Sequence, residues 1–318
     1  IVDVDAPAAE SHLVQLLDSG IALRPEAHVP VGLKVIESGK HLFMEKPIGT
    51  DLSSATALLE KAAAVGLRVG CAPDTFLGAG HQTAREIVDN GRIGKVISAT
   101  AVMQSSGPES WHPAPAFYYQ HGGGPLLDMG PYYLTSLVSF LGPIRSVTAR
   151  CAHGFSERVC GHESVRGQKV PVTVATHCCG VLEFVGGALA TVIMSFDVAH
   201  HSMPQIELHG TDGSLSVPDP NHFGGEVRLA AWGTHSWIPC ELNRPFQENT
   251  RILGLVDLLD GLERGRPSRC DGALAAHVLE AMLAFEKSER SGTRIELASR
   301  PDRPLALSQG EHFGSSPS

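Results

Sequence analysis

Residues 39–47 read GKHLFMEKP: a glycine near the start, a short apolar run, and then an acid, a lysine and a proline. The apolar run at 41–44 predicts a β-strand, and Gly39 stands where the left-handed C-cap of a preceding helix is expected. Apolar residues at helical spacing between 26 and 37 indicate that helix. Because ligands of open α/β sheets bind beyond the carboxyl ends of the strands, we expect the ammonium of Lys46 to face a binding crevice.

The same alternation of strand and helix extends to both sides of this stretch. Residues 1–5 predict a buried strand of a parallel sheet. Thr50 is expected to cap a helix that Gly66 ends, and residues 68–71 predict a further strand. Short apolar strands that alternate with helices are typical of a parallel, doubly wound sheet. We assign residues 1–73 to this first domain.

Beyond residue 73 the pattern changes to strand-like runs with fewer helices. The predicted strands are 96–103, 146–152, 172–175, 180–184, 188–196 and 205–209. Residues 211–214, TDGS, predict a hairpin in which Gly213 adopts a positive φ. The chain is therefore predicted to be α/β, with an incomplete parallel-sheet domain followed by an α+β domain built on an open, mostly antiparallel sheet. We place the second domain at 74–307 and a loose tail at 308–318.

The composition excludes several classes of protein. Twenty-five basic residues against 34 acidic ones give a net charge of −9, and no dense basic cluster offers a footprint for nucleic acid. No run approaches the ~20 apolar residues that a membrane span needs, so we expect a soluble protein with no membrane partner. The seven cysteines show neither CxxC nor metal-ligand spacing. We therefore expect reduced thiols, a cytoplasmic location and no metal site.

Several motifs, in their order along the chain, resemble the Gfo/Idh/MocA family of oxidoreductases. They are PEAH at 25–28, GKH at 39–41, EKP at 45–47, DNGRIGK at 89–95 and GGGPLLDMG at 122–130. The first three have the spacing usual in the family. The fourth is similar to the family's entry into its second domain, and the last is similar to its glycine-rich helix start. The likeness covers roughly residues 21–300.

The resemblance implies a Rossmann domain that binds NAD or NADP, and hydride transfer between the nicotinamide and a sugar or polyol. It also implies a homodimer or homotetramer formed through the open sheet face. Family enzymes use the lysine of EKP, an aspartate and a histidine in catalysis. Lys46 and Asp128 match the first two, and Tyr132 stands at the histidine position. The other residues implied to bind the cofactor with Lys46 are Asp3, Pro25, His28 and Glu45.

Elementary chemistry supports the catalytic assignment. Asp128 and Tyr132 are four residues apart, so one helical face presents both side chains to one substrate. A neighbouring ammonium such as Lys46 would stabilise a phenolate, which allows Tyr132 to exchange the proton of a substrate hydroxyl. The alternative is that Tyr132 packs in the core with its hydroxyl at a wet edge.

An aromatic and histidine-rich stretch at 111–121 precedes the glycines. Sugars offer apolar C–H faces and hydroxyl edges, which aromatic rings with hydrogen-bonding groups can bind. We predict that Trp111, His112 and Tyr119 bind the substrate together with Asp128. A loop packed against the partner domain or a partner subunit would have the same composition.

No G-x-G-x-x-G segment precedes Ile1, although a dinucleotide site needs such glycines to bring backbone N–H groups to the pyrophosphate. We therefore expect an N-terminally truncated cofactor site. Residues 1–5 match either the family's second strand, in which Asp3 or Asp5 would bind the adenosine ribose, or its fourth strand, with 13–24 as an insertion. The sequence leaves three possibilities for the function. The protein is a dehydrogenase, a lyase or glycosidase that uses the nicotinamide transiently, or a non-catalytic form that binds sugar or oligomerises.

Overall fold

The computed structural model describes residues 2–4 and 24–308, which fold around two main β-sheets. The smaller sheet consists, in spatial order, of β1 (Val2–Val4), β2 (His41–Met44) and β3 (Val69–Cys71). The larger sheet consists, in spatial order, of β13 (Ile238–Cys240), β12 (Val227–Ala231), β11 (Gly213–Val217), β10 (Ile206–Gly210), β4 (Val96–Gln104), β9 (Leu189–Ser195), β8 (His177–Phe184), β5 (Ile144–Ala152) and β14 (Ile295–Glu296). A separate hairpin pairs β6 (Glu157–Val159) with β7 (Lys169–Pro171).

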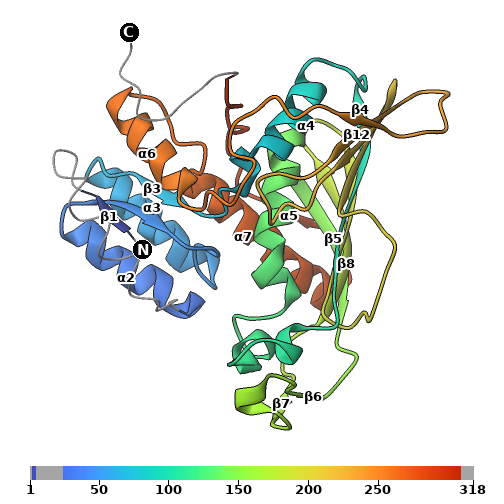
Figure 1. Cartoon of the computed structure of the whole chain (residues 1–318). Helices are drawn as coiled ribbons and strands as arrows, with labels where there is room; N and C mark the ends of the chain where they lie inside the picture. The colour runs from blue at the N-terminus through green and yellow to red at the C-terminus, as the bar shows by residue number, and fades with distance from the viewer. Residues whose placement is uncertain (1, 5–23, 309–318) are drawn as a thin grey trace.

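The helices pack against the smaller sheet and against one face of the larger sheet (Figure 1). They are α2 (Pro25–Glu37), α3 (Leu52–Ala64), α4 (Ala79–Asp89), α5 (Pro125–Leu141), α6 (Leu253–Glu263) and α7 (Gly272–Ser291). Figure 1 shows α5 and α7 between the two sheets, where their apolar side chains join one continuous core. Within the larger sheet only the β4–β9 pair is parallel. The predicted fold class, a small α/β part followed by a mostly antiparallel sheet, is confirmed.

The smaller sheet differs from the prediction in the direction of its first strand. β2 and β3 run parallel, with Phe43 opposite Gly70, as the alternation of strands and helices predicts. β1 instead pairs antiparallel with β2, with Val2 opposite Phe43. Both assignments of residues 1–5, to a second or a fourth parallel strand, are therefore wrong for this structure. Parallel and antiparallel ladders both satisfy the backbone of an edge strand, so a short β-branched run does not fix its direction.

Three local predictions also fail for physical reasons. Helix α3 is capped by Asp51 and not by Thr50, because the Asp51 carboxylate accepts a backbone N–H of the first turn. Residues 172–175 form no strand, and the N–H groups of Val172 and Thr173 bond to the backbone oxygens of two separate segments, at Ser156 and Tyr119. Gly213 does not have a positive φ. It is required there because a Cβ would lie 2.5 Å from the carbonyl oxygen of Ala230 on the neighbouring strand.

The C-terminal part of the chain returns to the smaller sheet. Figure 1 shows α6 beside β3, although α6 begins at Leu253. An isolated bridge pairs Gly70 of β3 with Asp271, and the Asp271 side chain caps α7 by accepting the N–H of Ala273. The smaller sheet is therefore covered on one side by residues far beyond position 73.

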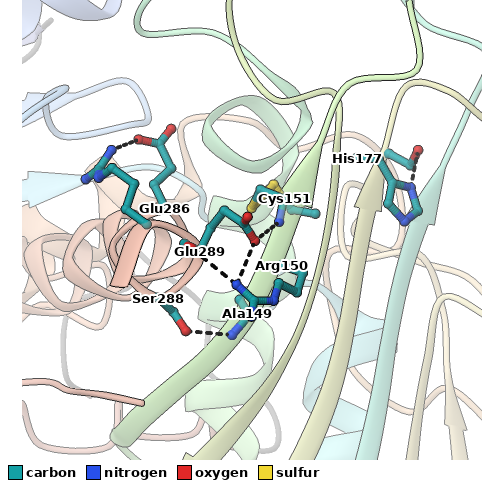
Figure 2. The surroundings of a disulfide bond; sticks show 10 residues. Ala149, Arg150, Cys151, His177, Glu286, Ser288 and Glu289 are labelled. Atoms are coloured by element: carbon teal, nitrogen blue, oxygen red, sulfur yellow. Dashed lines mark hydrogen bonds and ion pairs between the residues drawn. A yellow bond between two sulfur atoms is a disulfide. The ribbon is translucent and has the colours of Figure 1, made fainter. Parts of the chain in front are cut away.

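A disulfide joins Cys151 of β5 to Cys178 of β8 (Figure 2). The two residues are opposite each other in the antiparallel ladder, with their Cα atoms 4.2 Å apart. Beside them, Glu289 of α7 accepts the N–H of Cys151, and Ser288 accepts the N–H of Ala149. The expectation that all thiols are free is therefore wrong. A spacing of 27 residues carries no disulfide signature, and only the strand register brings the two sulfurs together.

The buried histidines make the stability of the chain depend on pH. Burial lowers the pKa of His81 to about 4, and burial together with Arg300 lowers that of His277 to about 4 against an opposing Glu280. His277 accepts the N–H of Ile144 through Nε2, so protonation there breaks a bond. Among the described residues, neither ring nitrogen of His81 has a hydrogen-bond partner.

Because each folded-state pKa lies below the unfolded value of about 6.5, the unfolded chain binds protons first as pH falls. Stability is therefore lost between about pH 6.5 and 4, by roughly 3 kcal/mol for each histidine. Urea unfolding at several pH values measures this loss, which H81L should reduce. H235L removes an exposed histidine as the control. An identical pH dependence in H81L and the parent chain would contradict the prediction.

Candidate active site

Lys46 lies just beyond the carboxyl end of β2, where the sequence predicts a binding crevice. Its Nζ donates to the carboxylate of Asp128 at 2.8 Å and to the backbone oxygen of the same residue at 2.6 Å. Burial alone would lower the pKa of Lys46, but the attraction of Asp128, with smaller effects of Tyr132 and Glu45, outweighs burial and raises it. Lys46 is therefore held as an ammonium.

Helix α5 brings Asp128 and Tyr132 to this ammonium. The helix begins with Pro125 at its first position, directly after Gly124, whose φ of 90° suits a glycine. Asp128 lies in the first turn and Tyr132 one turn later. The Lys46 Nζ atom is 5.1 Å from the centroid of the Tyr132 ring, within the range of a cation–π contact. The three residues predicted as catalytic are thus in mutual contact through Lys46.

The hydroxyl of Tyr132 contacts a residue that sequence reasoning missed. Nη1 of Arg251 donates to the Tyr132 oxygen at 3.1 Å. A guanidinium has no acceptor, so the tyrosine oxygen must accept this bond. Tyr132 is 7% exposed, and no described residue accepts a hydrogen bond from its phenolic hydrogen. Arg251 is 119 residues away from Tyr132 in sequence and belongs to no motif that could have indicated it.

The predicted cofactor residues occupy different positions around the turn at 45–47. Pro25 is the first residue of α2, and Glu45 is exposed. His28 is only 3% exposed, and its Nδ1 donates to the backbone oxygen of Pro47 at 2.7 Å. His28 therefore fixes the turn that carries Lys46. Asp3 belongs to β1, but its side chain lies outside the described residues.

Residues 105–121, which we call the aromatic strap, precede α5. Trp111 is 62% exposed, and the ring of His112 contacts Trp111 and Tyr118 edge-on. Tyr119 is fully buried and donates its hydroxyl to Glu109, a placement that argues against contact with a substrate. Burial, followed by the charges of Asp128 and Tyr132, raises the pKa of Tyr118. Tyr118, which no sequence motif singles out, is therefore within electrostatic range of Asp128 and Tyr132.

A buried arginine of the β6–β7 hairpin anchors the aromatic strap. Arg158 donates to Glu109 of the strap at 3.1 Å and to Asp197, just beyond β9, at 2.6 Å. It also donates to the backbone oxygens of Ser106 and Phe196. One guanidinium therefore joins three chain segments that lie next to the predicted substrate site.

Two absences hold for the part of the chain that the structure describes. Among the described residues, there is no cluster of three or more His, Cys, Asp or Glu side chains that could bind a metal ion. No helix there combines the length and the apolar composition that crossing a membrane requires.

Two family models match the chain and together cover more than half of it. Residues 15–72 match an oxidoreductase family with an NAD-binding Rossmann fold, and residues 81–216 match the GFO/IDH/MocA C-terminal domain. The first match includes β2 and Lys46, and the second includes α5 with Asp128 and Tyr132.

Characterised relatives are distant but extend over most of the chain. D-glucoside 3-dehydrogenase of Escherichia coli (strain K12) is 24% identical over 85% of this chain and 76% of its own length. Inositol 2-dehydrogenase 3 of Saccharopolyspora erythraea is 26% identical over 87% of this chain and 75% of its own length. The structure of levoglucosan dehydrogenase in complex with NADH and L-sorbose superposes with a TM-score of 0.74 at 18% identity. That superposition covers 88% of this chain and 79% of the other, and it establishes the shared fold.

Proposed function

This chain belongs to the Gfo/Idh/MocA family of oxidoreductases, and we propose that it transfers a hydride between NAD or NADP and a hydroxyl-bearing carbon of a sugar or polyol. The observation that carries the proposal is the contact of Lys46 with both Asp128 and Tyr132 beyond the carboxyl end of β2. Ligands of open α/β sheets bind at that edge. The sugar and inositol dehydrogenases among its relatives support the choice of substrate class.

The three side chains have separate roles in this proposal. When bound, the nicotinamide supplies the hydride for reduction or takes it up in oxidation. In the reducing direction, the free phenolic hydrogen of Tyr132 passes to the substrate carbonyl oxygen, while the Lys46 ammonium stabilises the charge that develops there. Arg251 and Lys46 then stabilise the phenolate that remains. Asp128 holds Lys46 and orients the hydroxyl groups of the sugar.

We propose that the nicotinamide binds at the turn at 45–47. This turn follows the parallel strand β2, and the His28 side chain holds it by a hydrogen bond to the backbone oxygen of Pro47. The Lys46 side chain is 16% exposed. Glu45, Lys46 and Pro47 would therefore line the reactive end of the cofactor. Titration of the chain with NADH and with NADPH, followed by nicotinamide fluorescence, should show saturable binding of one or both. A folded sample that binds neither would contradict the cofactor assignment.

The aromatic strap is proposed to bind the sugar. Trp111 and His112 present exposed or half-buried rings, which suit the C–H face of a sugar. Tyr118 takes the place predicted for Tyr119, because the Tyr119 hydroxyl is committed to Glu109. If this is correct, W111A should raise KM for the sugar several-fold and leave nicotinamide binding unchanged.

We further propose that the chain forms a homodimer or homotetramer through the larger sheet. Val181 and Leu189 are exposed, whereas their neighbours Leu182 and Ala190 are buried. Since side chains alternate along a strand, the exposed pair lies on the face that points away from α5 and α7. Light scattering should give the mass of a dimer or tetramer, and the V181E L189E variant should be smaller. A monomeric parent chain would contradict the proposal.

A further inference from the structure

Arg251 is a cation at the candidate active site without a salt-bridge partner among the described residues. Its Nη2 donates to two neutral oxygens of Asn221, at 2.7 and 3.2 Å, and its Nη1 donates to Tyr132. The Lys46 ammonium, in contrast, is paired with Asp128. Asp74 is near enough to interact with Arg251 electrostatically, but its carboxylate accepts backbone N–H groups instead.

The backbone beside Arg251 is held in a costly conformation. Ile252 has a φ of 92°, which β-branched residues rarely adopt. The same Oδ2 atom of Asp74 accepts the N–H groups of Ile252 and Gly254, each at 3.0 Å. Asp74 is 3% exposed and follows β3, so the turn is fixed to the edge of the smaller sheet. Such strain persists where the surrounding structure requires it, often at binding sites.

The exposed guanidinium keeps N–H donors that no described residue uses. Arginine has five N–H donors, and the three bonds to Tyr132 and Asn221 leave two of them for the oxygens of a carboxylate or phosphate. The guanidinium is fixed at Tyr132, so its ligand would lie close to the reacting hydroxyl.

We propose that Arg251 binds an oxyanion of the substrate, so that the enzyme prefers sugars carrying a carboxylate or a phosphate over neutral sugars. This inference rests on the proposed function, because it assigns the substrate class of the same site. Charge-assisted hydrogen bonds are stronger than neutral ones, and their loss is expected to weaken binding about tenfold or more. Addition of salt should weaken the binding of the anionic sugars and leave that of neutral sugars unchanged.

Calorimetric titration of the full chain with D-glucuronate, D-glucose 6-phosphate and D-glucose tests the proposal. At least one anionic sugar should bind about tenfold more tightly than glucose, and the tighter of the two identifies the oxyanion. R251Q should lower the ratio of anionic-sugar to glucose affinity about tenfold, to near one, and R251K should retain part of that ratio. R290Q, which removes an exposed arginine of α7, should behave like the parent chain.

Equal affinity of the parent chain for all three sugars, or no binding of any, would overturn the oxyanion site. A preference that survives in R251Q, with melting curves showing that the variant is folded, would overturn the role of Arg251. Nicotinamide binding is measured separately, so failure of this proposal is distinguishable from failure of the oxidoreductase assignment. A merely structural role of Arg251 would weaken the binding of all the sugars equally and would not change their ratio.

Discussion

Replacement of Lys46 by methionine is expected to lower kcat/KM for the oxidation of a sugar or polyol about 10²–10⁴-fold, the usual contribution of a positioned group that assists proton transfer. Methionine fills a similar volume but carries neither the charge at the substrate oxygen nor the bond to Asp128. Because the stabilised charge develops in the transition state, kcat should fall more than KM rises. Steady-state assays at 340 nm measure both constants.

K61M is the matched control for this variant. Lys61 belongs to the same part of the chain, but its ammonium is exposed and pairs with Glu37 at the surface. Surface pairs contribute little to stability, so K61M should keep the parent activity and melting temperature. If K46M were folded and turned over at the parent rate, the catalytic assignment of Lys46 would be wrong.

Replacement of Arg158 by methionine is expected to destabilise the chain by about 3–5 kcal/mol, the typical cost of leaving buried charges unpaired. Arg158 neutralises Glu109 and Asp197, and all three side chains are almost fully buried. Its loss also releases the aromatic strap from the β6–β7 hairpin. Thermal melting should show a lower midpoint, and limited proteolysis should cut more rapidly within residues 105–121.

R150M provides the matched control, because Arg150 forms an exposed pair with Glu289. That pair is expected to contribute at most about 1 kcal/mol. A double variant, R158M E109Q, removes one of the two carboxylates that R158M leaves unpaired, and it should recover part of the lost stability. Equal melting midpoints for R158M and R150M would show that the buried cluster does not anchor the strap.

Local sequence patterns predicted the parts of the molecule that depend on neighbouring residues. The apolar run at 41–44 with Lys46 behind it, and the spacing of Asp128 and Tyr132 on one helical face, needed no information from elsewhere in the chain. Strands and helices follow from apolar periodicity because burial of one face decides both. The direction of β1 could not be predicted in this way, since it depends on the partner that the strand meets.

Contacts between distant segments could not be predicted from the sequence. Arg251 donates to Tyr132 from the turn before α6, Asp74 accepts a backbone N–H of that turn, and the three residues belong to no common motif. Tyr118 and Tyr119 are adjacent and chemically identical. Tyr119 is buried with its hydroxyl bonded to Glu109, whereas Asp128 acts electrostatically on Tyr118.

Transfer of deuterium tests the central claim most directly. The full chain would be incubated with NAD or NADP and sugars or polyols, both neutral and anionic, that carry deuterium on the carbinol carbons, and the nicotinamide would be examined by mass spectrometry. We expect reduced cofactor that carries one deuterium, formed at the same rate by the parent chain and by K61M and about 10²–10⁴-fold more slowly by K46M. A folded chain that binds NADH or NADPH and substrate, yet never transfers the label, would contradict the account.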